Sequence, residues 1–156
     1  MNGAKNGSGA RLVFVCIGTP RIIGDSVGPR VGSMLKKAGV QAFVYGTLEK
    51  PITALNLHLY RKMIATYHRS DIVVAIDATM GDIADIGTVK LTDGGLRPAG
   101  AFRNRSAKLG DIGIMAIVGE KEGDMLLQLK VADEQFVATL AEDVCRIAET
   151  AAAGIA

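Results

Sequence analysis

Apolar runs and apolar stripes alternate along the first half of the chain. Continuous apolar runs are typical of strands buried on both faces, whereas offsets of four and seven are typical of one helix face. The pattern predicts a strand over 12–17, a helix over 27–38, a strand over 40–45, a helix over 55–67 and a strand over 72–76. Because the links are short, this order favours parallel pairing with strand 12–17 in the centre.

The second half of the chain also contains apolar runs and stripes, but strands and helices no longer alternate regularly. It predicts a short strand over 86–91, a strand over 112–118 and a final helix marked by apolar residues over 136–147. Between them, 92–110 reads as a long loop, which we expect to be a mobile flap or partner surface beside the functional site. We therefore expect a three-layer α/β/α sandwich with a mostly parallel sheet of about five strands.

Composition narrows the class of protein. The chain has 156 residues, of which 49% are hydrophobic and 22% charged, so it can form a buried core. We expect a disordered leader over 1–10, rich in Gly, Asn and Ser, and one domain over 11–156. The formal charge of +2 provides no global attraction for nucleic acid or membrane, and no apolar run reaches the roughly 20 residues of a membrane span.

The two cysteines lie far apart, each inside an apolar pattern. Cys16 belongs to the first strand and Cys145 to the last helix, so two buried free thiols are expected rather than a disulfide. This usage favours a reduced, cytoplasmic protein.

Two carboxylates are the main candidates for chemistry. In an open parallel sheet, ligands bind where the strand order reverses, here between the strands over 12–17 and 72–76. Asp25 follows the first of these strands and Asp77 ends the second, so the topology brings both to one place. Together they could share a proton and activate water, or hold a divalent metal. Alternatively, Asp25 caps the following helix, and Asp77 is a hydrogen-bonded structural carboxylate.

Other residues are weaker candidates. The spacing of Gly18 and Gly24 fits neither a dinucleotide fold nor a phosphate-binding loop, which disfavours nucleotide binding. Several polar, glycine and basic residues could support the site or bind substrate: Thr19, Gly24, Thr47, Asn56, Lys90, Arg97 and Lys108. Alternatively, Thr47 is only a turn residue and Asn56 only an amide on a helix surface. The basic residues Lys90, Arg97 and Lys108 would then belong to a solvated loop surface.

Six short motifs, in this order and spacing, resemble the sporulation proteins of the YyaC type. The motifs are Gly18-Thr19, Gly24-Asp25-Ser26-Val27-Gly28-Pro29, Tyr45-Gly46-Thr47-Leu48-Glu49-Lys50-Pro51, Asn56-Leu57, Ala75-Ile76-Asp77-Ala78 and Leu109-Gly110-Asp111-Ile112. That family is similar to the spore germination protease and, more distantly, to the hydrogenase maturation endopeptidases. The resemblance implies a phosphorylase/hydrolase-like fold with one antiparallel strand, and a catalytic pair at Asp25 and Asp77.

The resemblance also implies a function. It favours an endopeptidase-like hydrolase acting on a protein or peptide, as a cytoplasmic protein of the forespore or spore core that could form a homo-oligomer. One alternative is a non-catalytic binding or regulatory protein that retains the acidic pocket, because the chain has little beyond the core domain. The other is a metal-dependent maturation endopeptidase.

The histidines argue against the last alternative. The hydrogenase relatives bind nickel with the two acidic positions and a later histidine, whereas His58 and His68 are the only histidines and both precede Asp77. We expect His68 to interact with the end of its helix and His58 to lie on a partly polar face. No metal site is predicted beyond weak binding of a divalent ion by Asp25 and Asp77.

Overall fold

The computed structural model describes residues 9–98 and 108–155. Its five strands form one sheet in the order β2-β1-β3-β5-β4. The strands are β1 (Leu12–Cys16), β2 (Phe43–Tyr45), β3 (Ile72–Gly81), β4 (Val89–Asp93) and β5 (Ile112–Glu120). The helices are α1 (Val27–Ala38), α2 (Leu57–Tyr67), α3 (Met125–Val131) and α4 (Glu134–Ile155), with short 3₁₀ turns η1 (Ile23–Asp25) and η2 (Ile83–Asp85).

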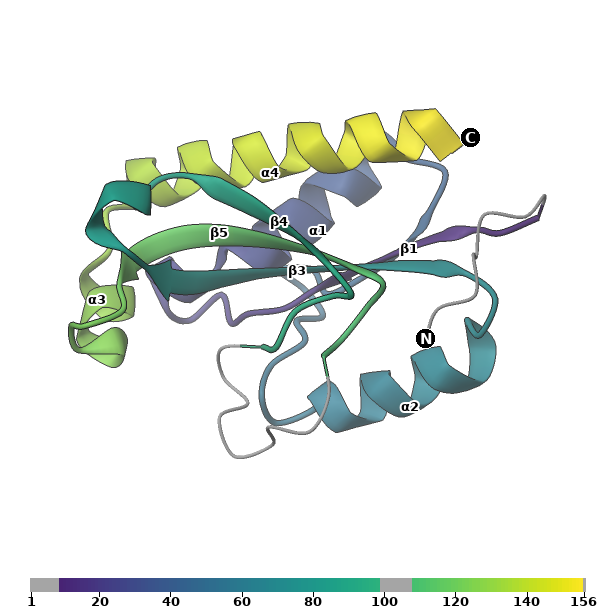
Figure 1. Cartoon of the computed structure of the whole chain (residues 1–156), viewed down its shortest axis with the longest axis horizontal. Coiled ribbons are helices and arrows are strands. Elements are labelled where there is room, and N and C mark those ends of the chain that lie inside the picture. The colour runs from purple at the N-terminus through teal and green to yellow at the C-terminus, as the bar shows by residue number, and fades with distance from the viewer. Residues whose placement is uncertain (1–8, 99–107, 156) are drawn as a thin grey trace.

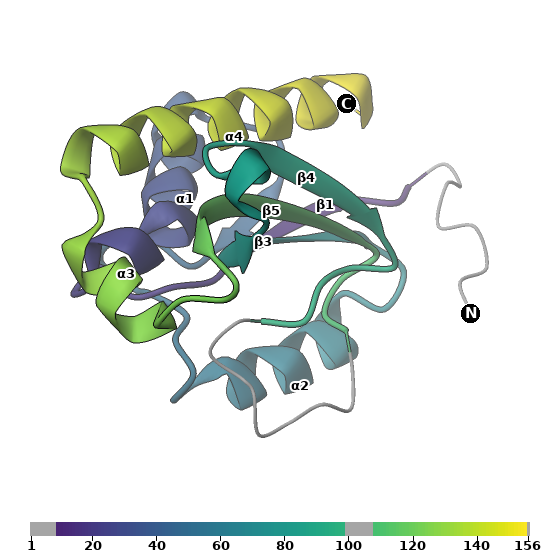
Figure 2. The same ribbon diagram turned by 60° about the vertical axis from the view of Figure 1, so that its left-hand side comes forward.

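The predicted topology is confirmed. β1 lies between β2 and β3 and is parallel to both, β5 is parallel to β3, and β4 alone among these strands is antiparallel. Helices α1 and α4 cover one face of the sheet and α2 lies on the other (Figure 1, Figure 2). Alternate residues of β1 serve the two layers: Phe14 and Cys16 face α1 and α4, while Val13 and Val15 face α2.

Helix α1 lies unusually close to the ends of β1 and β2. A methyl group on Gly28 would lie 2.1 Å from the carbonyl oxygen of Ile17, and one on Gly32 would lie 1.8 Å from that of Gly46. These two positions therefore require glycine, and the four-residue spacing puts both on one helix face. The helix ends as predicted at Gly39, which has φ of 68°.

Several elements differ from the expected boundaries. β3 continues to Gly81 instead of ending at Asp77, because β5 pairs with it beyond the point where β1 leaves the sheet. β2 begins only at Phe43. Helix α3 was not predicted; the side chain of Asp124 caps it by accepting a hydrogen bond from the Leu127 N–H, at 3.1 Å.

Part of the apolar pattern that predicts the second helix faces outward. Leu55 is 88% exposed and Leu59 58% exposed, whereas Leu57 and Ile64 are the buried residues of α2. The helix exists as predicted, and it contacts the core layer on its side of the sheet through Tyr60, Met63 and Ile64 of the predicted pattern, together with Leu57. Leu96 and Leu109 pair with each other and join the same core layer as α2, so the two described ends of segment 92–110 are anchored. The middle of that expected flap, 99–107, lies outside the described residues.

A polar network around the buried residues His68 and Asp71 links the end of α2 to β2 and to the residue before β1. His68 follows the last residue of α2, and its Nδ1 lies 2.7 Å from Asp71 Oδ2, while its Nε2 lies 2.8 Å from the Tyr45 hydroxyl. Arg11 donates to the same carboxylate at 3.0 Å. The His68 side chain therefore bonds to Asp71 and Tyr45, and not to the helix carbonyls as expected.

Both cysteines are free and buried, as predicted. Burial raises the pKa of the Cys16 thiol, so this group is not prepared to act as a thiolate nucleophile. No helix among the described residues is long and apolar enough to cross a membrane.

Candidate active site

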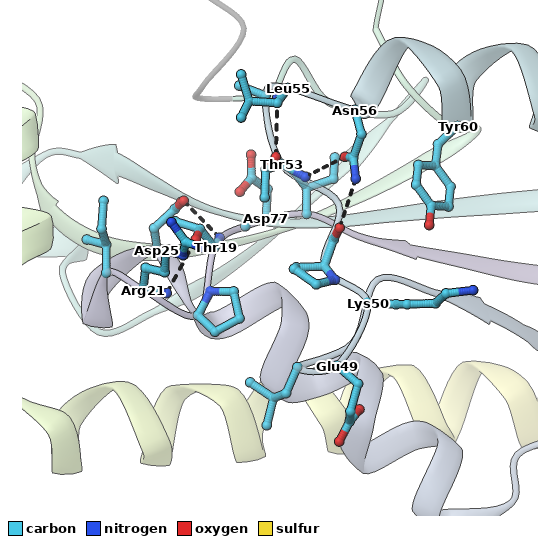
Figure 3. A pocket seen from close by; sticks show the side chains of 17 residues that line it. Thr19, Arg21, Asp25, Glu49, Lys50, Thr53, Leu55, Asn56, Tyr60 and Asp77 are labelled. Carbon is cyan, nitrogen blue, oxygen red and sulfur yellow. Dashed lines mark hydrogen bonds between the residues drawn. The ribbon is translucent and has the colours of Figure 1, made fainter.

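A cleft of about 1050 Å³ opens at the carboxyl end of β1. Its walls are the loop after β1, the loop between β2 and α2, Tyr60 of α2 and Asp77 of β3 (Figure 3). The cleft therefore lies between β1 and β3, where the strand order reverses and where the topology predicts a ligand site.

Asp25 comes to this cleft from a sharply turned loop. Gly18 leaves the sheet with φ of 147°, and a methyl group there would lie 2.2 Å from the Asp25 carbonyl oxygen. The carboxylate accepts a hydrogen bond from the Thr19 N–H, 3.1 Å from Oδ2. Burial raises the pKa of Asp25 to about 6, although that hydrogen bond acts in the opposite direction.

Asp25 is not the cap of α1. Ser26 occupies the N-cap position, and its hydroxyl donates to the Ile23 carbonyl oxygen at 2.6 Å. A partly buried carboxylate with a raised pKa and no capping role is typical of a functional group.

Asp77 lies inside β3 and is 3% exposed. The last contact of β1 with β3 is the hydrogen bond from the Ile17 N–H to the Ile76 carbonyl oxygen, at 2.8 Å. Asp77 is the next residue, and it lines the cleft just beyond the end of β1. The Ala78 N–H donates to its Oδ1 at 2.8 Å, so the buried carboxylate is hydrogen-bonded to the backbone of its own strand.

Asn56 lines the cleft and holds its wall in shape. Its carbonyl oxygen accepts from the Thr53 N–H at 2.8 Å, and its amide donates to the Pro51 carbonyl oxygen at 3.1 Å (Figure 3). Both ends of the amide thus bond to the loop before α2. Asn56 therefore supports the cleft wall. Thr19 has a supporting position too, because its N–H donates to the Asp25 carboxylate.

Thr47 and Gly24 lie just behind the cleft wall. Thr47 closes a turn with Lys50, whose N–H donates to the Thr47 hydroxyl at 3.0 Å. Gly24 packs against α3, where a methyl group would lie 2.7 Å from the Cα atom of Leu129. Both positions support residues that line the cleft, Lys50 and Asp25.

The three basic candidates from the second half of the chain do not line the cleft. Lys90 is on β4, the strand at the far edge of the sheet from β2, and pairs with Asp85 at 2.8 Å. Arg97 and Lys108 are exposed at the two described ends of segment 92–110. The expectation that these residues supply charge to the acidic pair is not supported, because the antiparallel strand carries Lys90 away from β1.

Other residues line the cleft without having been predicted. Arg21, Glu49, Lys50 and Tyr60 are among them. A signal existed for Glu49 and Lys50, since their loop follows β2 and must emerge at the same sheet edge. Tyr60 gave no signal, because its helix has apolar residues on more than one face.

The described residues contain no group of three or more His, Cys, Asp or Glu side chains placed to hold a metal ion. His58 is exposed on α2, and His68 belongs to the network around Asp71. Weak binding of a divalent ion by Asp25 and Asp77 stays a prediction.

The sheet order, the layers and the position of the cleft define a phosphorylase/hydrolase-like α/β protein. Within that class, the chain belongs to the family described as "Protein of unknown function (DUF1256)", whose model matches residues 4–147. The chain is 37% identical over 115 residues to the "Uncharacterized protein YyaC" of Bacillus subtilis (strain 168). That match covers 73% of this chain and 56% of the relative, so the chain spans little more than half of that protein.

Solved structures share the fold. The [NiFe] hydrogenase maturation protease HycI from Thermococcus kodakarensis KOD1 superposes with a TM-score of 0.59 at 19% identity, over 92% of this chain and 93% of that one. The [NiFe] hydrogenase maturation protease HybD from Thermococcus kodakarensis superposes with a TM-score of 0.55 at 17% identity, over 91% of this chain and 99% of that one. A peptidyl-tRNA hydrolase superposes with a TM-score of 0.62 at 11% identity, over 99% of this chain and 91% of that one. At these identities the likeness concerns the fold.

Proposed function

We propose that the protein is an endopeptidase-like hydrolase in which Asp25 and Asp77 activate water against a peptide bond. The observation that supports this proposal is that two carboxylates line one cleft at the reversal of strand order. They arrive from different parts of the chain, and one of them has a pKa raised by burial. Similarity to the fold of maturation proteases adds support for a peptidase.

We assign the two carboxylates different roles in the reaction. Asp25, with a pKa of about 6, keeps its proton into the weakly acidic range and acts as the general acid. Asp77, which accepts the Ala78 N–H, is assigned the complementary role of general base. Two carboxylates that divide the acid and base roles between them are a recurrent basis for hydrolysis.

The reaction follows from these roles. Asp77 takes a proton from water as the water oxygen bonds to the peptide carbonyl carbon. As the carbon–nitrogen bond then breaks, Asp25 gives its proton to the leaving amine. The products are a carboxylic acid and an amine, and exchange of protons with solvent restores the starting state of both aspartates.

The resemblance to sporulation proteins extends this proposal to the biological setting. We place the activity on a protein or peptide of the forespore or spore. A peptide library prepared from Bacillus subtilis proteins is therefore a suitable pool of substrates for the test.

The library is incubated with the wild-type protein, Asp25→Asn and Asp77→Asn, each with and without a chelator, and new termini are identified by mass spectrometry. Cleavage that resists the chelator and is lost in both variants supports the proposal. Chelator-sensitive cleavage points instead to a metal-dependent maturation endopeptidase. Absence of cleavage with retained peptide binding identifies a non-catalytic binding protein.

A further inference from the structure

A second hollow of about 670 Å³ adjoins the cleft. Glu49, Lys50 and Tyr60 line both spaces, so the two hollows share this wall. In Figure 3, Asp25 and Arg21 lie at one end of the cleft, and Lys50 and Tyr60 lie at the other. A chain bound across the aspartates in that direction would pass into the second hollow.

The second hollow is basic. Lys36 and Lys37, in the last turn of α1, line it together with Lys50, against the single carboxylate of Glu49. All three lysines are exposed. The ion pairs recorded among the described residues use other basic groups: Arg11, Arg30, His68, Lys90, Lys121 and Arg146. The positive charge of the hollow is therefore available to a ligand.

The backbone around these lysines is held in place. The Thr47 N–H donates to the Lys50 carbonyl oxygen at 3.1 Å, and the Lys50 N–H returns a bond to the Thr47 hydroxyl. The Leu48 N–H donates to the Ser33 hydroxyl of α1 at 2.9 Å, which ties the turn to the helix that carries Lys36 and Lys37. The charges are thus presented from a fixed frame, which lowers the cost of ordering on binding.

Two aromatic rings line the second hollow, and one of them, that of Tyr60, also lines the cleft. The rings of Tyr45 and Tyr60 lie 6.2 Å apart and both line the second hollow. The Tyr45 hydroxyl is fixed by His68 Nε2 at 2.8 Å. Tyrosine pairs of this kind offer apolar area with polar tips, which suits the backbone and side chains of a peptide.

We propose that this second hollow is a carboxylate-binding subsite, through which the protein selects peptides that carry an acid on one side of the cleavage point. The inference rests on the proposed function and adds the chemical class of its substrate. The carboxylate can come from an internal Glu or Asp side chain or from a free carboxyl terminus, since both present the same group to Lys36, Lys37 and Lys50.

The charge distribution favours an acidic peptide over a nucleic acid. A polyphosphate chain needs a continuous positive track. Here Glu49 interrupts the basic hollow, and the adjoining cleft contains Asp25 and Asp77. A single carboxylate on an otherwise neutral chain can reach the lysines without meeting these acids.

Binding is measured on full-length Asp25→Asn protein, which separates recognition from cleavage. The probes are fluorescent 12-residue peptides with one Glu scanned through a Gln-containing background, and the same background with a free or an amidated carboxyl terminus. The double variant Lys36→Glu/Lys37→Glu reverses the charge of two lysines that line the second hollow. Lys62→Glu/Lys130→Glu is the control, because both residues are exposed, line neither space and change the net charge equally.

We expect one window of Glu positions, or the free carboxyl terminus, to bind about 5- to 20-fold more tightly than the neutral peptide at low salt. The preference should disappear in Lys36→Glu/Lys37→Glu and persist in the control. Equal binding of acidic and neutral peptides, an unchanged preference in Lys36→Glu/Lys37→Glu, or tighter binding of single-stranded RNA would overturn the proposal. Acid-dependent binding without cleavage by the wild type would leave the subsite standing and reject only the peptidase activity.

Discussion

Replacing Asp25 by Asn should stabilise the folded protein at neutral pH. The pKa of this carboxyl is raised by burial from 3.8 to about 6, so the folded state holds its proton more tightly than the unfolded state does. Each unit of difference corresponds to about 1.4 kcal/mol, which makes the cost of ionising Asp25 about 3 kcal/mol at most. Because the side chain is partly exposed, we expect Asp25→Asn to gain about 1–3 kcal/mol.

The pH dependence gives this prediction its direction. Below about pH 4 both states of the wild type are protonated at Asp25, and the two proteins should be equally stable. As pH rises from 4 to 6 the unfolded state ionises first and the wild type loses stability, so the advantage of the variant grows. Above pH 6 it should remain constant. The neutral amide can still accept the Thr19 N–H, so this bond is retained.

Urea unfolding followed by circular dichroism at pH 4, 5, 6 and 8 measures the effect. Asp93→Asn, on an exposed residue of β4, is the matched control and should change stability by less than about 0.5 kcal/mol. An Asp25→Asn protein that is less stable than the wild type at pH 8 would refute the reasoning. The same conclusion would follow if the stability difference did not change between pH 4 and pH 8.

Three further changes test the frame around the site. Asp71→Asn should lower the free energy of unfolding by about 2–4 kcal/mol at pH 7. Burial raises the pKa of Asp71, but hydrogen bonds from Arg11 and His68 lower it to about 2. This stability is therefore present above pH 4 and is lost as pH falls toward 2, which acid unfolding curves would show. Gly24→Ala should cost about 1–3 kcal/mol in thermal unfolding, because its methyl group would meet the Leu129 backbone, whereas Gly154→Ala meets nothing within 4 Å and should not destabilise. In peptide cleavage, Asp25→Asn/Asp77→Asn should be no slower than either single variant, and additive losses would show that the carboxylates act separately.

Much of the fold follows from the sequence because its central strands are buried on both faces. The apolar runs that form β1 and β3 leave little ambiguity, and Gly39 ends α1 where its pattern stops. The same logic brings Asp25 and Asp77 to one cleft, because short crossovers on opposite faces of the sheet fix where the strand order reverses.

The sequence does not specify which face of a helix contacts the sheet, nor the position in the sheet of the strand that carries Lys90. Leu55 and Leu59 have the spacing of a core stripe and yet are exposed, whereas Leu57, Met63 and Ile64 contact the core. Lys90 belongs to a strand whose antiparallel pairing with β5 places it far from β1. The approach of Lys36 and Lys37 to Lys50 depends on the packing of α1 against the turn after β2, which no local pattern records.

The pH dependence of peptide cleavage tests the proposed role of the acidic pair most directly. With a peptide identified from the library, kcat/KM is measured between pH 4 and pH 8 for the wild type and Asp25→Asn. If protonated Asp25 supplies the proton to the leaving amine, the wild-type rate should fall above an apparent pKa near 6, and the variant should be inactive throughout. A rate that keeps rising above pH 7, or an Asp25→Asn protein that still cleaves at the wild-type rate, would contradict the account.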